Sequence, residues 1–415
     1  MTRRVAVLAA VVFLSPWTTA AEPNGFFFHP GDHVLFLGDS ITEQYQYSTF
    51  IELYLTTRFP KGNMTFHNAG IGGDTATGGA RRFAGHVMAE KPTAVTIDFG
   101  MNDGGYGGFD PRRAEQYVRS TEEMLKAAKK AGVRVALISP NAVEVRSRSN
   151  LKTYLETQEK FYAPLKELAA KYDVPFVDQY AVTRKVLEKI AADDAKVKPF
   201  PDGVHTSKAG GLLMAHTILT GLHAPAEVSR FEADVSKPDV VVGNCEIANH
   251  RFAANQVSFD RTDHALPLPV LTEWRDLLPY VDQLKDLNEY GLKVSGLKPG
   301  KYDLKIDGQL VGAYTADELA AGVNVGNAEK GPIFDQGMKV LAAIDAKNDL
   351  LHKRFRQVVM FDPKNVPDWV TSPDEVAQKR RDQLAKYDKQ IEEKQAEVYR
   401  LAAPVQHHWE IKAAE

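Results

Sequence analysis

Cysteine is nearly absent from this sequence: Cys245 is the only one among 415 residues. A single thiol excludes an intramolecular disulfide, so a hydrophobic core has to stabilise the folded chain. The apolar run at 241–245 is typical of a strand. We therefore expect Cys245 to be a buried core thiol rather than a nucleophile.

An excess of positive charge is absent as well, because 51 Lys and Arg residues face 54 Asp and Glu residues, for a formal net charge of −3. This balance provides no excess of positive charge to bind nucleic acid and no net attraction to an anionic membrane surface. Beyond the N-terminus, no segment approaches the roughly 20 apolar residues that a membrane-spanning helix needs. We expect a small or neutral ligand as the partner, and no pattern indicates an oligomeric state.

Sequence signals for metals, phosphates and cofactors are missing too. No two of the 12 histidines show metal-ligand spacing beside carboxylates, so we predict no catalytic metal. The glycine-rich stretch 68–75 lacks the spacing of a Walker A loop, and no Gly-x-Gly-x-x-Gly follows the first predicted strand. We therefore predict no phosphate or dinucleotide site and no cofactor.

The N-terminus is typical of a leader. Two arginines precede an apolar run at 5–14, and small residues at 18–21 offer a cleavage site. We therefore expect residues 1–21 to be a signal peptide and the protein to be secreted or periplasmic. The paired arginines leave the choice between general and twin-arginine export open.

From about residue 31 to 222, short β-like runs alternate with longer helical patterns. This alternation predicts a parallel sheet with helices on both faces and right-handed crossovers. Pro164 predicts a kink or a break in the last of the helices. The predicted strands are 34–37, 64–68, 94–99, 133–139 and 174–177, and the predicted helices are 43–58, 76–90, 111–131 and 150–171.

A serine follows the first predicted strand at the tight turn Gly38-Asp39-Ser40. Open α/β sheets bind their ligands at the carboxyl ends of their strands, and the Ser40 hydroxyl is delivered to that edge. Ser40 is therefore a candidate nucleophile. The alternative is that it caps the N-terminus of the next helix.

An aspartate and a histidine lie far downstream, in the stretch 201–206 that precedes a helix opening at Ser207. Acyl transfer by serine needs a base to take the hydroxyl proton and a carboxylate to hold that imidazole in the correct tautomer. Asp202 and His205 can meet both needs on one turn, and His205 is the only one of the 12 histidines in such a context. We predict that they act with Ser40.

Two further loops follow predicted strands. The glycine-rich stretch 68–75 lets backbone N–H groups approach a ligand closely, or is simply a conformationally demanding turn. After the third strand, the amide of Asn102 can donate a hydrogen bond to a developing oxyanion, or can cap a turn. The glycine run within 104–109 cannot pack a core, so we expect a mobile rim that carries Tyr106 over the ligand.

Four blocks of this sequence resemble, in order, the signature blocks of the SGNH hydrolase superfamily, also called GDSL esterases and lipases. The resemblance covers residues 31 to 222, within a domain assigned to 22–225. It implies an α/β fold, a three-layer α/β/α sandwich of the SGNH and flavodoxin-like kind with a five-stranded parallel sheet. It also implies a serine hydrolase mechanism, although the G-x-S-x-G elbow is missing. The blocks are Gly38-Asp39-Ser40, the glycine turn ending at Gly73, Gly100-x-Asn102-Asp103, and Asp202-x-x-His205.

The resemblance assigns a role to each matching residue. In this superfamily a serine attacks the ester, a histidine acts first as base and then as acid, and a carboxylate orients the histidine. The oxyanion would be held by the backbone N–H groups of the serine and of Gly73, or of Gly72 if the alignment shifts by one residue. The third donor would be the side-chain amide of Asn102. The implied nucleophile, base and orienting carboxylate are Ser40, His205 and Asp202.

The sequence past residue 222 predicts additional structure. Residues 226–315 alternate between strands and turns, so we expect a small β-rich module, whose use as a carbohydrate-binding domain, a lid or a wall of the site stays open. Residues 316–415 are expected to be a helical extension, in which Asp317 caps a short helix. The charged helix at 373–402 is interpreted as a packing arm, because the sustained heptads of a coiled coil are missing.

The preferred function is an exported carboxylic-ester hydrolase that removes acetyl or other small acyl groups from a polysaccharide or a sugar. Tyr106 and Phe109 could stack on a sugar ring, and Arg146 and Arg148 follow the fourth strand, although all four are equally explained as exposed loop residues. A lipase, lysophospholipase or thioesterase would need a long apolar groove, which these residues do not suggest. A third alternative is a non-catalytic carbohydrate-binding protein on a hydrolase fold.

Overall fold

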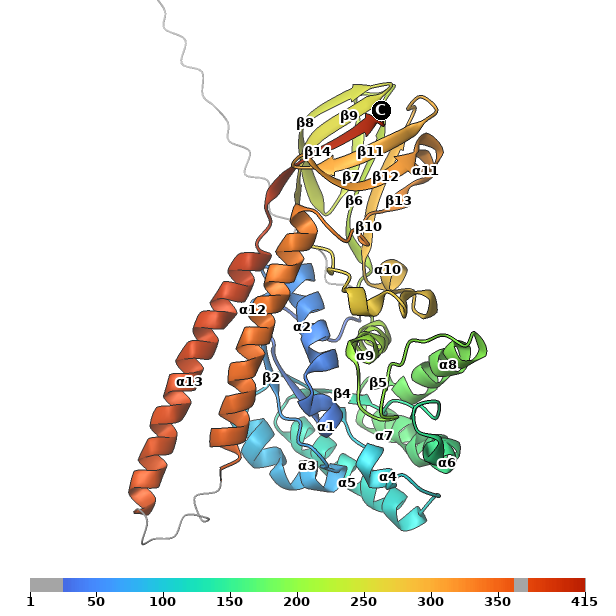
Figure 1. The fold of residues 1–415 in the computed structure, drawn as a ribbon. Helices are drawn as coiled ribbons and strands as arrows, with labels where there is room; N and C mark the ends of the chain where they lie inside the picture. The colour runs from blue at the N-terminus through green and yellow to red at the C-terminus, as the bar shows by residue number, and fades with distance from the viewer. Residues whose placement is uncertain (1–24, 362–371, 415) are drawn as a thin grey trace, which may run out of the picture.

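The computed structural model describes residues 25–361 and 372–414 (Figure 1). These residues form an α/β domain, a β module and two long helices that run down one side of the α/β domain. The predicted signal peptide, 1–21, lies outside the described residues. Among the described residues, no helix is both long enough and apolar enough to cross a membrane.

The α/β domain is built on five parallel strands in the order β2-β1-β3-β4-β5, which confirms the predicted sheet. The strands β1, β3 and β4 are buried on both faces, in agreement with their continuous apolar runs. In this order the chain changes direction between β1 and β3, where folds of this kind bind their ligands. The strands are β1 (His33–Gly38), β2 (Thr65–Asn68), β3 (Ala94–Asp98), β4 (Arg134–Ile138) and β5 (Phe176–Val177).

Helices cover both faces of this sheet. Helices α2 and α9 pack together on one face, and α5 packs against α3 and α7 on the other. The predicted helix at 150–171 is divided at Pro164, the first residue of α7, because proline lacks the N–H that would continue the helix. The helices are α1 (Ser40–Glu43), α2 (Gln46–Arg58), α3 (Ala76–Arg82), α4 (Met101–Gly104), α5 (Pro111–Lys130), α6 (Lys152–Tyr162), α7 (Pro164–Tyr172), α8 (Gln179–Ala192) and α9 (Lys208–Gly221).

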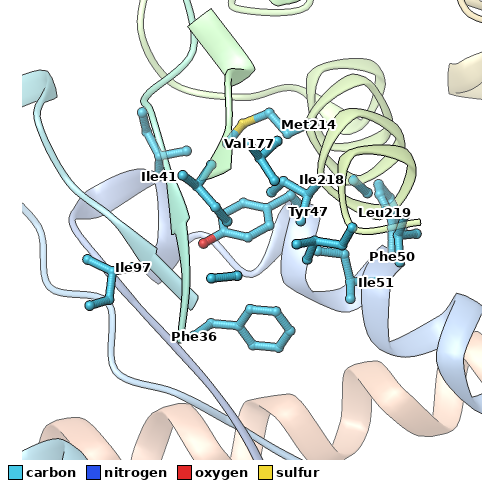
Figure 2. Close-up of a cluster of buried hydrophobic side chains, with 14 of the residues drawn as sticks. Phe36, Ile41, Tyr47, Phe50, Ile51, Ile97, Val177, Met214, Ile218 and Leu219 are labelled. Carbon is cyan, nitrogen blue, oxygen red and sulfur yellow. The ribbon is translucent and has the colours of Figure 1, made fainter. Parts of the chain in front are cut away.

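The core between the sheet and helices α2 and α9 fixes the start of α2 (Figure 2). The rings of Phe36 from β1 and Tyr47 from α2 meet edge to face, with their centroids 6.1 Å apart. The buried Tyr47 hydroxyl is satisfied by a 2.8 Å hydrogen bond with the Thr42 hydroxyl. Because Thr42 belongs to α1, this packing holds α1 against the end of β1, where Ser40 lies.

The β module packs two sheets around a core of its own. The rings of Phe231 and Phe259, one from each sheet, stack with their centroids 4.1 Å apart. The Cys245 thiol is buried here, and burial raises its pKa to about 11, which confirms the prediction of a core thiol. One sheet has the strand order β13 (Val323–Asn324), β10 (Glu289–Ser295), β6 (Glu227–Asp234) and β7 (Val240–Gly243). The other has the order β12 (Gln309–Thr315), β11 (Lys301–Ile306), β14 (Gln406–Ala413), β9 (Gln256–Asp263) and β8 (Cys245–Ala253).

The last strand corrects the predicted division of the chain at residue 315. Strand β14 lies in the region that was expected to be a helical extension, yet it pairs antiparallel with both β9 and β11 in the middle of a sheet. The polar alternation of this segment is a weak strand signal by itself. Pairing with strands far away in the sequence decides its conformation.

A second correction concerns α11 (Ala316–Ala321), whose N-cap is Thr315 rather than Asp317. The Glu318 N–H donates to the Thr315 hydroxyl at 3.2 Å, and the Thr315 N–H donates to the Glu318 carboxylate at 2.7 Å. This reciprocal pair is a capping box, which satisfies two backbone donors at once. Asp317 already lies inside the first turn.

The rest of the expected extension is largely helical, at 332–359 and at 373–402. Helix α12 (Pro332–Arg354), continued by the π-helical turn η6 (Phe355–Val359), packs against α13 (Pro373–Ala402), and both helices pack against α2 (Figure 1). Val398 and Ala402 of α13 are completely buried in the core that includes the α/β domain. The charged helix at 373–402 therefore packs within the same chain, as the interpretation as a packing arm requires.

Candidate active site

Ser40 lies where β1 turns into α1. Asp39 is the N-cap of α1, because its carboxylate accepts a 2.9 Å hydrogen bond from the Ile41 N–H. The alternative in which Ser40 caps the helix is therefore wrong, and its hydroxyl is available to another partner. Glycine is required at position 38, because a Cβ there would lie 2.6 Å from the Asp98 carbonyl oxygen.

A chain of hydrogen bonds joins Ser40 to His205 and Asp202. The Ser40 Oγ lies 2.8 Å from the His205 Nε2, and the His205 Nδ1 lies 2.7 Å from the Asp202 Oδ2. The other Asp202 oxygen accepts the backbone N–H groups of Val204 and His205, at 2.9 and 2.7 Å. Partial burial alone would raise the pKa of Asp202, but these hydrogen bonds outweigh it and hold the pKa below its usual range. Asp202 is therefore an ionised and anchored partner for the imidazole.

Gln44 ties this histidine loop to the serine turn, a role that the sequence did not indicate. Its side-chain oxygen accepts both the N–H and the hydroxyl of Thr206, each at 3.1 Å. The side chains of His205 and Asp202 remain 39% and 56% exposed. Water and a substrate can therefore reach the imidazole while its position is fixed from two sides.

The glycine-rich loop after β2 passes Ser40 at Gly72, where a Cβ would lie 4.0 Å from the Ser40 Cβ. The Gly72 N–H donates to the Glu43 Oε2 at 2.6 Å, whereas the Gly73 N–H has no hydrogen-bond partner among the described residues. This difference favours Gly73 over Gly72 as the backbone N–H donor to an oxyanion. Gly73 has φ +76°, a backbone conformation that glycine adopts readily. The Ser40 N–H is a second donor, because the first residue of a helix has no acceptor within that helix.

Asn102 faces the same loop from α4. Its Nδ2 donates to the Asp74 carbonyl oxygen at 2.8 Å and lies 3.4 Å from the Asp39 Oδ2, while its Oδ1 accepts the Tyr106 hydroxyl at 2.9 Å. The N-cap of α4 is Gly100, with no side-chain cap, so the alternative in which Asn102 caps a turn is wrong. The Tyr106 hydrogen bond orients the amide with its N–H groups toward the Asp74 carbonyl oxygen and the Asp39 carboxylate.

The four predicted rim residues divide into two groups. Tyr106 contacts Asn102 and packs on Tyr154, with ring centroids 5.5 Å apart, so it belongs to the site. Arg146 does not lie free on a rim, because it pairs with Glu144 and donates to two backbone carbonyl groups of residues 195 and 197. The other two form local contacts: the ring of Phe109 lies 4.4 Å from the Lys160 Nζ, and the Arg148 Nε donates to the Asn150 Oδ1 at 3.1 Å.

The glycine run beside Tyr106 is packed more closely than the sequence suggested. A Cβ at Gly104 would lie 2.2 Å from the Tyr154 hydroxyl oxygen, and one at Gly105 would lie 1.8 Å from the Arg113 Nη1. Gly104 and Gly105 therefore permit close approach between segments, whereas a Cβ at Gly108 would meet nothing within 4 Å. The expectation that this run cannot pack is wrong for its first two glycines.

An open pocket adjoins Asn102. Its volume is about 470 Å³, within the usual range for ligand pockets. Every residue that lines it has a polar or charged side chain. They are Thr75, Thr77, Asn102, Asp103, Asp110, Arg112, Arg113 and Gln116. In the part of the chain that the structure describes, no group of three or more His, Cys, Asp and Glu side chains could hold a metal ion.

Three carboxyl groups lie near the site: Asp39 and Asp98 are buried, and Asp103 is partly buried where it lines the pocket. Burial raises the pKa of Asp39 and of Asp103 to about 7, and raises that of Asp98 well above its usual range. The hydrogen bond that Asp103 accepts from the Ala76 N–H, at 3.0 Å, opposes this shift without cancelling it. These groups hold their protons in the folded protein at pH values where the unfolded chain has lost them.

These raised pKa values should make the free energy of unfolding depend on pH. The stabilisation from a protonated Asp103 is complete below about pH 4 and is lost as the pH rises through about 7, since the folded state binds the extra proton. The free energy of unfolding should therefore fall less between these pH values in Asp103→Asn than in the wild type. The two decreases should differ by about 1 kcal/mol or more. Urea unfolding at about pH 4.5 and about pH 7.5 measures the difference.

The matched control for this prediction is Asp110→Asn, which changes a carboxylate that caps α5 at the rim of the same pocket. Asparagine is also a good N-cap, so this variant should follow the wild type at both pH values. Identical pH dependence in Asp103→Asn and the wild type would contradict a protonated Asp103.

Comparison with known proteins gives two informative relatives. A sequence model of the GDSL-like Lipase/Acylhydrolase family matches residues 36–211. The thioesterase 1/protease 1/lysophospholipase L1 of Escherichia coli is 30% identical over 149 residues, and the match covers 35% of this chain and 65% of that protein. An acetylxylan esterase of Geobacillus stearothermophilus is 26% identical over 216 residues, which are 46% of this chain and 93% of that protein.

One solved structure resembles nearly the whole chain. It is described as a gut microbial diltiazem-metabolizing enzyme, has a TM-score of 0.81 at 25% identity, and covers 93% of this chain and 98% of its own. This coverage extends far beyond residues 36–211. The β module and the two long helices are therefore part of a shared architecture rather than an appendage of this chain alone.

Proposed function

Residues 36–211 belong to the GDSL-like lipase/acylhydrolase family within the SGNH superfamily, and from this membership we propose that the protein is a serine carboxylic-ester hydrolase. The observation that carries the proposal is the 2.8 Å contact between the Ser40 Oγ and the His205 Nε2. A hydroxyl in this contact can lose its proton to the imidazole as it attacks an ester carbonyl carbon.

In the proposed mechanism, His205 takes the Ser40 proton while Asp202 keeps the imidazole in the tautomer that accepts at Nε2. The Ser40 oxygen attacks the ester, and the N–H groups of Ser40 and Gly73 with the Asn102 amide hold the oxyanion. His205 then gives its proton to the leaving alcohol, and an acyl-enzyme remains. A water molecule, deprotonated by His205, releases the carboxylic acid and restores the serine.

We propose that the substrate is an acetyl or other small acyl ester of a polysaccharide or a sugar. The polar lining of the pocket beside Asn102 supports a hydroxyl-rich alcohol group, because polar side chains can pair with sugar hydroxyls. The acetylxylan esterase relative supports the same class. The leader pattern at 1–21 supports export, which would bring the enzyme to extracellular polymers.

The second candidate is a thioesterase or lysophospholipase, which the Escherichia coli relative favours. A long acyl chain needs an extended apolar groove to leave water, at about 0.8 kcal/mol for each buried CH₂ group. The pocket beside Asn102 offers polar side chains instead. A binding protein without turnover is disfavoured, because the hydrogen-bonded Ser40, His205 and Asp202 are what catalysis requires and binding does not.

The test is hydrolysis of one ester series, from acetyl to octanoyl, together with acetylated xylan and diltiazem, which is itself an acetate ester. We expect kcat/KM to be at least about tenfold higher for the acetyl than for the octanoyl ester, because a small acyl site penalises extra methylene groups. Acetate release from xylan would support a carbohydrate substrate. Preference for octanoyl or a thioester would favour the second candidate, and binding of xylan without acetate release would favour the binding protein.

A further inference from the structure

Helix α12 packs along α2 in the antiparallel direction, so its C-terminal end lies toward α1, the helix that begins at Ser40 (Figure 1). Four side-chain contacts from α12 and η6 reach α2, Tyr45 and α1. Lys347 forms a buried ion pair with Glu52, and Asn348 donates a hydrogen bond to Thr49. One turn later the rings of His352 and Tyr45 meet edge to face, with their centroids 5.9 Å apart. The last contact is an ion pair of 3.3 Å between Arg356 and Glu43.

The last contact reaches the serine turn itself. Glu43 ends α1, and its two carboxylate oxygens have different partners: Oε1 faces the Arg356 Nε, and Oε2 accepts the Gly72 N–H at 2.6 Å. The loop lies directly against the serine, since a Cβ on Gly72 would be 4.0 Å from the Ser40 Cβ. It also lies against α1, because a Cβ on Gly70 would be 2.3 Å from the Glu43 nitrogen.

Gly73 is held between two anchored neighbours. Gly72 is anchored by Glu43, as described. On the other side, the Asp74 carboxylate pairs with Arg82 at 2.8 Å, and the Asp74 carbonyl oxygen accepts the Asn102 amide. A glycine-rich loop without such anchors would sample many conformations, so the direction of the Gly73 N–H depends on them.

We propose that Arg356, through Glu43, is a positioning residue that fixes the Gly73 N–H for the oxyanion, and this inference rests on the proposed serine hydrolase function. The guanidinium holds the Glu43 carboxylate with its second oxygen aimed at the Gly72 N–H. The C-terminal helices thereby take part in the reaction without touching the substrate. This role differs from that of a purely structural contact, whose loss would lower the stability of the fold but not the stabilisation of the transition state.

The experiment compares Arg356→Gln, Arg356→Lys and Glu43→Ala with the wild type in the full-length chain. Ester hydrolysis gives kcat and KM, and a fluorophosphonate probe gives the rate at which the Ser40 oxygen displaces fluoride from phosphorus, read by intact mass. Losing an oxyanion donor outright costs about 10²- to 10³-fold, so loss of its support in Arg356→Gln should cost about five- to tenfold in kcat, with KM changed less than about twofold. Arg356→Lys should recover part of the loss.

Glu43→Ala should cost more than Arg356→Gln, because it also leaves the Gly72 N–H without its acceptor. The double variant should be no slower than Glu43→Ala, since both changes act through one carboxylate. The matched control is Arg381→Gln, which removes an arginine whose guanidinium donates to Gln378 on its own helix. It should keep the wild-type kcat and labelling rate.

The outcomes separate this inference from the function on which it rests. A wild-type protein that neither hydrolyses any ester nor reacts with the probe would overturn both. An active wild type with unchanged kcat and labelling in Arg356→Gln would overturn the inference alone. So would additive losses in the double variant, or a fall in kcat matched by a fall in melting temperature that Arg356→Lys does not reverse.

Discussion

Replacing Ser40 with alanine is expected to lower kcat/KM for an acetyl ester by at least about 10⁴-fold, because the acyl-enzyme can no longer form. The Ser40 hydroxyl oxygen lies 2.8 Å from the His205 Nε2. His205→Ala should cost about as much, since the residues of a nucleophile–base pair act as a unit. Acetate release under matched conditions, with reaction by a fluorophosphonate probe, measures both effects.

Ser236→Ala is the matched control for Ser40→Ala, because Ser236 lies in a turn of the β module and its hydroxyl donates to the nearby Asp234. This variant should keep full activity. Ser40→Ala should also keep its melting temperature within a few degrees, since the hydroxyl is not needed to cap α1. An alanine variant that still hydrolyses esters at a tenth of the wild-type rate would exclude Ser40 as the nucleophile.

Replacing Lys347 with methionine is expected to destabilise the folded protein by about 3 to 5 kcal/mol, the usual cost of leaving one partner of a buried ion pair alone. The side chains of Lys347 and Glu52 are 0% and 2% exposed. The Lys347 ammonium also donates to Gln395 at 3.1 Å and lies 5.4 Å from the centre of the Phe66 ring. It therefore joins both C-terminal helices to the α/β domain. Urea unfolding at neutral pH measures the loss.

Two further variants make this expectation specific. In the double variant Lys347→Met and Glu52→Met no buried charge is left unpaired, so most of the stability should return. Lys339→Met, at an exposed position of the same helix, should change stability by less than about 0.5 kcal/mol. A loss below about 1 kcal/mol in Lys347→Met would mean that the pair is not buried as described.

The positions of the proposed nucleophile, base and orienting carboxylate could be predicted because their signals are local. An apolar strand that ends in a tight glycine turn places Ser40, and four residues of one turn hold both Asp202 and His205. The choice between Gly72 and Gly73 could not be made in the same way. The choice depends on which of the two neighbouring N–H groups donates to the Glu43 carboxylate, and that is Gly72. Two adjacent glycines cannot be told apart in this respect from the sequence.

Other predictions failed where a distant partner decides what a side chain does. Arg146 was interpreted either as a substrate-rim residue or as an exposed loop residue, but backbone carbonyl groups about 50 residues further along the chain accept hydrogen bonds from its guanidinium. Strand β14 was expected within a helical extension, but two strands of the β module provide the hydrogen bonds that make it a strand.

The sequence by itself determined the parallel sheet, the helices that cover it, and which residues stand at the ends of its strands. It could do so because apolar periodicity and turn chemistry act between neighbours along the chain. Only the tertiary structure decided what holds the site in place: the Lys347 and Glu52 pair, the contact of Arg356 with Glu43, and the free N–H of Gly73. The two ion pairs depend on how helices about 300 residues apart pack together, and the free N–H depends on Glu43 reaching Gly72 from α1; no local pattern specifies either.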